Sequence, residues 1–393
     1  MVDQYSPPER EAEGQMLMNR RSFLAGAGGV TVAALLAGCQ RASDASLRLA
    51  MVANSVPAQL LKAFQQWPER GGDIAVTPQN SLVELYSLLQ RWQAQPKGAA
   101  PRGATPVANW VSLADYWLAP AIRQGLVQPI EVSTLTRWSD LAAVWPQLVR
   151  RDTQGIPSSE GSIWAMPYRW SHLVLLYDPS RLPRSSAPLT TWADLRRPEL
   201  ARRVVLPDHP RLVLGLAQKA LGASANGEDP ATVEGLDAFL TDLQSQVRAY
   251  DSDHYLETLI IGDATAVVAW SDDALPLLNQ YHNLAVAVPP EGTLLSAQLW
   301  VQPKAIAPSP AALNWLDFCL ESDFAAQLAI FSQAASTQLW GAEPSQLPEP
   351  LQTPPAIALA PNVANQSEFL LPLTAAAEGR YSQLWQSLRS PSA

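Results

Sequence analysis

Short apolar runs alternate with amphipathic segments from residue 47 onward, and this alternation decides the fold class. Residues 47–53 (LRLAMVA) predict a strand, and residues 56–67 predict a helix that opens with proline, where a missing N–H costs little. The same strand-then-helix order continues to residue 125 and is typical of a parallel sheet covered by helices. The other elements expected here are strands at 73–77 and 106–113, helices at 81–92 and 113–125, and a Pro/Gly/Ala-rich loop at 93–106.

A second cycle of the same kind begins near Trp164. A chain of 393 residues is too long for one core, so two α/β lobes are expected. Ligands of such folds bind at the carboxyl ends of strands, often between domains. The predicted strands lie at 163–167, 171–178, 203–207, 247–252, 264–270 and 284–289, a capped helical turn at 190–200, and helices at 211–222, 233–246, 254–262, 272–281, 310–322, 323–333 and 373–388.

The composition is that of a folded, acidic protein. Apolar residues make up 47% and charged residues 16% of the chain, which is typical of globular proteins. The net charge is −9. Phosphate binding needs clustered cations, so nucleic acid is excluded as an expected partner, whereas a cationic ligand is compatible with this charge.

The first 38 residues have the pattern of an export signal. Arg20-Arg21 precede an apolar run that ends at Gly38-Cys39. A transmembrane or buried core helix is the alternative, but the run falls short of the roughly 20 residues that span a bilayer. The arginine pair resembles a twin-arginine signal, and Leu36 to Cys39 resembles the lipobox of bacterial lipoproteins. We therefore expect lipidation of Cys39, a tether at 39–46, and a mature protein outside the cytoplasm on a membrane surface.

The sequence offers little for catalysis or metal binding. It contains no GxSxG, HExxH or phosphate-binding loop motif, and its four histidines are scattered, so neither a metal site nor a cofactor is expected. Cys319 lies in an apolar helical pattern and is expected to be a small buried side chain. Two carboxylate pairs, Asp251 with Asp253 and Asp272 with Asp273, are candidates for acid–base work. Capping of helices by Asp253 and Asp272 is the favoured alternative.

The order of several motifs resembles the spermidine/putrescine-binding proteins, the substrate-capturing components of polyamine ABC importers. The motifs are YRWSHLVLLYD, TTWADLRRPEL, AYDSD, VVAW and PPEG, and the similarity is densest from Trp164 to Pro303. It implies a two-lobed, type II-like periplasmic-binding-protein fold with two mixed sheets, a hinge and an interlobe cleft. The implied crossings lie near 171–176 and 293–297. The implied lobes are 47–172 plus 296–342 and 173–295 plus 343–393.

The resemblance also implies which residues line the cleft. Polyamines are held by carboxylates that pair with ammonium groups and by aromatic walls. The family's first-lobe aromatics are replaced by Val52 and Ser55, and two of its acidic positions by His209 and Leu212. Ordinary polyamine specificity is thus in doubt unless Asp208, Asp272 or Asp273 turns inward. The expected ligand-binding residues are Tyr116, Trp170, Asp208, Ser252, Trp270, Asp272, Ser296 and Gln298.

Some of these residues have a structural alternative. Trp270 is favoured as a cleft residue over a core residue. Tyr116 is equally compatible with lining the cleft and with packing on the sheet. Trp170 is compatible with packing at the hinge instead of contacting the ligand.

The expected function is a lipid-anchored solute-binding protein without enzymatic activity, whose partners are a small, polyamine-like solute and the permease subunits of an ABC importer. Two alternatives stay open: an envelope scaffold or sensor with a degenerate cleft, and an extracytoplasmic enzyme that uses the paired carboxylates.

Overall fold

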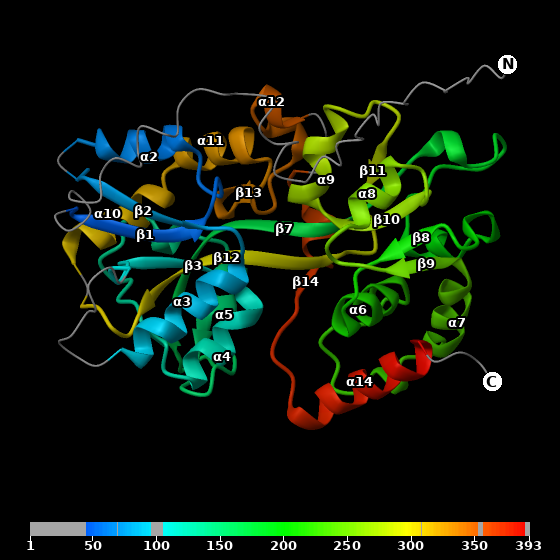
Figure 1. The fold of residues 1–393 in the computed structure, drawn as a ribbon, viewed down its shortest axis with the longest axis horizontal. Coiled ribbons are helices and arrows are strands. Elements are labelled where there is room, and N and C mark those ends of the chain that lie inside the picture. The colour runs from blue at the N-terminus through cyan, green and yellow to red at the C-terminus, as the bar shows by residue number, and fades with distance from the viewer. Residues whose placement is uncertain (1–44, 69, 96–104, 308, 353–356, 390–393) are drawn as a thin grey trace, which may run out of the picture. The chain divides into compact units, whose positions relative to one another are not determined.

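Two long antiparallel strands run side by side through the middle of the fold in the computed structural model (Figure 1). They are β7 (Ala165–Tyr177) and β12 (Leu294–Pro303). Both are nearly continuous apolar runs, which is the pattern of strands covered on both faces. The structure describes residues 45–393 except 69, 96–104, 308, 353–356 and 390–393. The predicted signal, Cys39 and most of the tether therefore lie outside the described residues.

A mixed sheet is built outward from these two strands. Its order is β2-β1-β3-β12-β7-β10-β8-β9, so the two predicted sheets share β7 and form one hydrogen-bonded path. The pairs β1–β2 and β1–β3 are parallel on one side, and β10–β8 and β8–β9 are parallel on the other. The outer strands are β1 (Leu47–Val52), β2 (Ile74–Gln79), β3 (Trp110–Ala114), β8 (Val204–Leu206), β9 (Val247–Tyr250) and β10 (Ala266–Trp270).

Helices connect the parallel strands, as the sequence pattern predicts. Ser81 caps one of them by accepting a hydrogen bond from the backbone N–H of Glu84. The helix expected over 113–125 is instead a 3₁₀ turn, η1 (Asp115–Trp117), followed by a short helix. Pro120 has no N–H to donate to the carbonyl of Tyr116, so a regular helix cannot extend through that turn. The helices before residue 150 are α2 (Ala58–Gln65), α3 (Leu82–Ala94), α4 (Leu118–Arg123) and α5 (Val144–Val149).

The second cycle follows the predicted order closely. The turn expected at 190–200 is the 3₁₀ turn η4 (Trp192–Arg196), closed by a capping box between Thr191 and Asp194. Its helices are α6 (Pro210–Ala220), α7 (Leu236–Gln246), α8 (Tyr255–Ile260) and α9 (Ser271–Leu278). The remaining elements are α10 (Pro310–Cys319), α11 (Ser322–Ser332), α12 (Glu349–Gln352), α13 (Pro361–Ala364), α14 (Ala375–Arg389) and the short strands β4 (Val127–Gln128), β5 (Arg150–Arg151), β6 (Ser162–Ile163), β11 (Ala285–Ala287), β13 (Ala335–Ser336) and β14 (Glu368–Phe369).

Separate hydrophobic cores lie toward the two ends of the sheet. The larger core ends at Trp170 on β7 and Leu295 on β12, and a second begins at Leu173 and Leu294. On both strands the change from one core to the other falls within or next to a predicted crossing, which supports the two-lobe prediction. The segment 357–369, placed in the second lobe by the predicted boundaries, contributes Phe369 to the larger core.

One expectation about a single feature can be compared with the described residues. Cys319 is fully buried in the larger core, which confirms its predicted role. Within the described part of the chain, no helix has the length and apolar character needed to cross a membrane.

Candidate ligand-binding cleft

A cavity of about 160 Å³ opens where the central strands β7 and β12 pass from one hydrophobic core to the other. Six of the eight predicted ligand-binding residues line it, and they come from β7, β10, β12, α9 and η1. We call this cavity the cleft. Its lining residues are Leu82, Tyr116, Arg169, Trp170, Ser171, Trp270, Asp272, Asp273, Ser296 and Gln298.

The floor of the cleft is the one partly open stretch of the central strands. Ser171 is the only partly exposed residue of β7. On β12, Ser296 and Gln298 are the only partly exposed residues. Ser171 pairs with Ser296 across the strands, and Arg169 pairs with Gln298. Because alternate residues of a strand share a face, these four polar side chains lie on the same face of the sheet. A polar floor within apolar strands is the arrangement of a binding site.

Trp270 forms a wall at one end of this floor. It is the last residue of β10 and the only one on that strand that is partly exposed. It pairs with Leu173 of β7, two residues beyond Ser171, which places it on the floor's face. An indole in this position can stack on an alkyl chain or on a cation.

The other two predicted aromatics lie differently. Tyr116 is 54% exposed in η1, while its neighbour Trp117 packs edge-on against Tyr86. Trp170 borders the cleft from the core side: it is 1% exposed, and its indole N–H donates to the carbonyl of Ser336 at 2.9 Å. The geometry of Trp170 therefore agrees with its alternative role as a packing residue near the crossing.

Asp208 and Ser252 lie outside the cleft. Ser252 Oγ accepts a hydrogen bond from the backbone N–H of Asp208 at 3.0 Å. The Asp208 carboxylate pairs with Arg389 of α14 at 2.5 Å. The partner of Asp208 lies on α14, far along the sequence. The residues around position 208 therefore do not predict this ion pair.

Two carboxylates do reach the cleft, each with a partner. Asp272 Oδ2 lies 2.8 Å from Arg169 Nη2. Asp273 Oδ2 accepts a hydrogen bond from the hydroxyl of Tyr255 at 2.6 Å. Burial and the charge of Asp273 raise the pKa of Tyr255, so Tyr255 stays protonated and keeps donating.

The predicted capping roles of Asp253 and Asp272 are wrong. The N-cap of α9 is Trp270, so Asp272 lies in the first turn of the helix, where its carboxylate forms an ion pair with Arg169. At α8 the N-cap is His254, and Asp251, instead of Asp253, accepts from the backbone N–H groups of Asp253 and His254. The short Asx-type turn formed by Asp251 replaces a direct cap.

A buried polar network lies beneath the floor. The Tyr168 hydroxyl is 2.9 Å from Ser112 Oγ and donates to Gln298 Oε1 at 2.9 Å. Asp115 accepts from Ser296 Oγ at 3.0 Å and from the Ala297 N–H at 3.1 Å. Burial raises the pKa of Asp115 to about 6, although these hydrogen bonds oppose the shift.

Comparison with known proteins identifies the family of this chain. The family described as bacterial extracellular solute-binding protein matches residues 111–353, well over half of the chain. The chain belongs to the bacterial extracellular solute-binding proteins.

Curated relatives of this solute-binding protein bear out the resemblance seen in the sequence. The spermidine/putrescine-binding periplasmic protein of Escherichia coli is 26% identical over 274 residues, which cover 70% of this chain and 72% of the relative. The protein of the same name from Salmonella typhimurium is 25% identical over the same span. The expected family resemblance is therefore confirmed.

Solved structures give the same fold. The spermidine/putrescine ABC transporter substrate-binding protein PotD of Streptococcus pneumoniae matches with a TM-score of 0.71 at 22% identity, over 87% of this chain and 98% of that one. A lipoprotein of Treponema pallidum matches with a TM-score of 0.64 at 16% identity, over 87% of this chain and 99% of that one. The solute-binding protein therefore has the expected α/β periplasmic-binding-protein fold.

Family membership also bears on the enzyme alternative. The family binds solutes and is not enzymatic, in agreement with the expected function. Both aspartates of the cleft are held by protein partners, Asp272 by Arg169 and Asp273 by Tyr255. Among the described residues, no group of three or more His, Cys, Asp and Glu side chains is placed to hold a metal ion.

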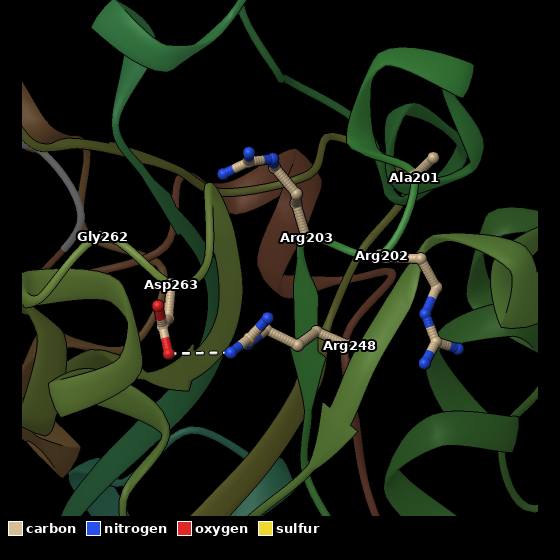
Figure 2. Close-up of a pocket in the computed structure, with 6 residues that line it drawn as sticks. All are labelled: Ala201, Arg202, Arg203, Arg248, Gly262 and Asp263. Carbon is tan, nitrogen blue, oxygen red and sulfur yellow. Dashed lines mark hydrogen bonds and ion pairs between the residues drawn. The ribbon is translucent and has the colours of Figure 1, made fainter.

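A second, larger cavity of about 390 Å³ contains none of the predicted residues of this solute-binding protein (Figure 2). Arg203 and Asp263 lie just before the first residues of β8 and β10, so this cavity is at the opposite end of β10 from Trp270. Its Arg248 pairs with Asp263 at 2.7 Å. Ligands of open α/β sheets bind at the carboxyl ends of strands, which favours the cleft.

Arg169 and Ser171 are the polar cleft residues of the solute-binding protein that sequence reasoning missed. Both lie in the YRWSHLVLLYD motif that carried the family resemblance. The signal was available: a charged residue two positions from a serine, inside an apolar strand, needs a specific partner. Arg169 is 7% exposed and donates to the backbone carbonyl of Ser55 at 3.0 Å as well as to Asp272.

Proposed function

We propose that this chain is the solute-binding component of a polyamine-type ABC importer and that it holds its solute in the cleft. The observation that carries the proposal is the gathering of Trp270, Asp272, Asp273, Ser296 and Gln298 around one cavity. An aromatic wall beside carboxylates is the chemistry that binds alkylammonium groups. The relatives named for spermidine and putrescine support the same ligand class.

The proposed mechanism is capture without chemistry. The cleft lies where β7 and β12 pass from one core to the other, so a small hinge motion there would open or close it. A solute bound between the two cores stabilises the closed form, and that form is presented to the permease subunits. The lobe boundaries given by the sequence belong to this proposal, except that the segment 357–369 packs in the larger core.

The membrane attachment is also part of the proposal. Cys39 follows Leu36-Ala37-Gly38, and a diacylglycerol on its thiol with a further acyl chain on its amino group would give stable anchoring. The Treponema pallidum structure with the same fold is named a lipoprotein, which supports this assignment. Membrane fractionation of the wild type and of Cys39→Ala tests it: the wild type is expected in the membrane fraction and the variant in the soluble fraction.

Thermal unfolding with a ligand panel tests the binding proposal. Spermidine, putrescine and N-acetylputrescine are compared with 1,4-butanediol, which has the butane chain of putrescine without its amines. A ligand that binds only the folded state raises the Tm with concentration. We expect at least one amine to raise the Tm and butanediol to leave it unchanged. Equal curves for all four compounds would contradict the binding proposal.

A scaffold or sensor role is the second candidate. One observation favours it: both Asp208 and Asp272 are already paired with arginines of the same chain. If no amine raises the Tm, and a partner protein is captured from the native membrane by the full-length lipoprotein, the scaffold role is the better conclusion.

A further inference from the structure

The last residue of α14 is an arginine held by the groups that usually bind a ligand cation. The Arg389 guanidinium lies 5.0 Å from the ring centroid of Tyr250 and 5.3 Å from that of Trp385. Its Nη1 is 2.5 Å from Asp208 Oδ1. A carboxylate beside aromatic rings is the combination that holds ammonium groups. Arg389 therefore fills a cation site with a side chain of the same protein.

This cation site lies at the same edge of the sheet as Trp270. Val267 of β10 pairs in parallel with Val205 of β8. The same register, carried three residues along both segments, sets Asp208 level with Trp270. Neighbouring strands are about 4.8 Å apart, and residues that pair in register point to the same face. Asp208 is therefore the next position along the edge after the indole that ends the cleft.

The packing of the second core supports this placement. Trp270 and Tyr250 both pack against that core, and Trp385 is part of it. The helix α14, which carries Arg389, packs along α6 and α7 (Figure 1). The row from Ser171 on β7 past Trp270 on β10 to Asp208 beside β8 spans two strand spacings, about 10 Å.

The ion pair of Asp208 and Arg389 is accessible to solvent. The two side chains are 43% and 41% exposed. Pairs as open as this one stabilise a fold little, so the Arg389 side chain can be changed without loss of the fold. The cleft itself has a volume of about 160 Å³, below the roughly 300–1,000 Å³ of pockets for drug-sized ligands, which favours a short solute.

We propose that Arg389 is a specificity-determining residue, which occupies the carboxylate next to Trp270 and restricts the cleft to short amines. A short amine ends at Trp270 and does not meet Arg389. A longer polyamine carries a further ammonium past Trp270 to Asp208, where the guanidinium already holds the carboxylate and repels a second cation. This inference rests on the proposed function and narrows its ligand class.

Isothermal titration calorimetry of the wild type and of Arg389→Gln with putrescine and spermidine tests this. Spermidine contains the putrescine unit and adds a three-carbon arm with a third nitrogen. In the variant we expect spermidine affinity to rise by about tenfold or more and putrescine affinity to stay within about twofold. An unchanged ratio of the two affinities overturns the inference, and binding of either amine then leaves the proposed function standing. If neither amine binds to either protein, the proposed function falls as well.

Arg380→Gln is the matched control. Arg380 lies on the same helix and pairs with Glu228 and Asp229 at 3.7 and 3.8 Å. This variant removes one positive charge from α14 and leaves Arg389 in place, so the ratio of spermidine to putrescine affinity should stay at its wild-type value. An equal rise in both variants overturns the inference, because the gain would then come from net charge alone.

Two further variants locate the source of the gain. In the double variant Asp208→Asn/Arg389→Gln the carboxylate is absent, so spermidine affinity should return to about the wild-type value. A gain that persists there overturns the inference. Arg389→Met keeps an unbranched stem against Tyr250 and Trp385 and covers the case in which Arg389→Gln does not fold; the same rise in spermidine affinity is expected. Circular dichroism verifies the fold of each variant.

Discussion

Ser296 Oγ donates a 3.0 Å hydrogen bond to Asp115 Oδ1, so a hydroxyl on the floor of the cleft rests on a buried carboxylate. The same oxygen accepts from the backbone N–H of Ala297 at 3.1 Å. Asp115 directly follows β3, and Ser296 and Ala297 lie on the neighbouring strand β12. The acid therefore fixes the floor of the cleft from below.

The buried acid gives stability a specific pH dependence. The pKa of Asp115 is about 6 in the folded chain, against about 3.9 in an unfolded one, because burial disfavours the charged form. The unfolded chain therefore loses this proton first. The contribution of Asp115 to stability is complete below pH about 4 and is lost as the pH rises through about 6, a change of roughly 2–3 kcal/mol.

Substitution by asparagine tests this sign. In Asp115→Asn the amide oxygen can still accept from Ser296 and Ala297, and the buried carboxylate charge is removed. We expect a higher free energy of unfolding than wild type at pH 7.5 and a smaller difference at pH 4. Urea unfolding at a series of pH values measures both. A difference between variant and wild type that stays constant from pH 4 to pH 7.5 would contradict the assignment, since other titrating groups contribute equally to both proteins.

Loss of the indole at 270 should weaken binding far more than folding. Trp270→Ala removes the wall beside Asp273, and we expect the affinity for N-acetylputrescine or putrescine to fall by about tenfold or more. Trp270→Phe should keep much of it. Trp67→Ala is the control, because Trp67 is also partly exposed and contacts a cation, Arg70, but lies outside the cleft. Similar losses of affinity for both alanine variants would argue against a binding role for Trp270.

The hydroxyl of Tyr168 is expected to orient Gln298. In Tyr168→Phe the ring still stacks on Trp300, at a centroid distance of 4.6 Å, but Gln298 and Ser112 lose a partner. We expect a loss of about 1–2 kcal/mol in the free energy of unfolding and a several-fold loss of ligand affinity.

A matched variant separates these two effects. Tyr381 is a buried tyrosine of the second core, and its hydroxyl bonds to Gln218. Tyr381→Phe should destabilise to a similar extent without changing affinity. Calorimetric titration and urea unfolding of both variants give the comparison, and unchanged affinity in Tyr168→Phe would remove Gln298 from the proposed binding residues.

Local sequence patterns predicted the elements, and the family resemblance predicted much of the cleft. Apolar runs located the central strands, and the Thr191–Asp194 capping box fixed η4 where the sequence placed it. Trp270 was expected in the cleft because it matches an aromatic wall of the family, and the structure places it at the end of β10 among the lining residues. The ion pair between Asp208 and Arg389 could not be predicted, because it depends on how α14 packs, and Arg389 lies 181 residues later in the chain. Strand alternation would have predicted Arg169 and Ser171, had a polar pair within an apolar run been taken as a floor.

Hydrogen–deuterium exchange by mass spectrometry, with and without N-acetylputrescine, putrescine or spermidine at saturating concentration, locates the bound solute. A solute held in the cleft slows exchange in the segments around residues 116, 169–171, 270–273 and 296–298, and leaves the segment around Arg203 and Arg248 unchanged. Protection confined to that distant segment, or none at all for a ligand that raises the Tm, would contradict binding in the cleft.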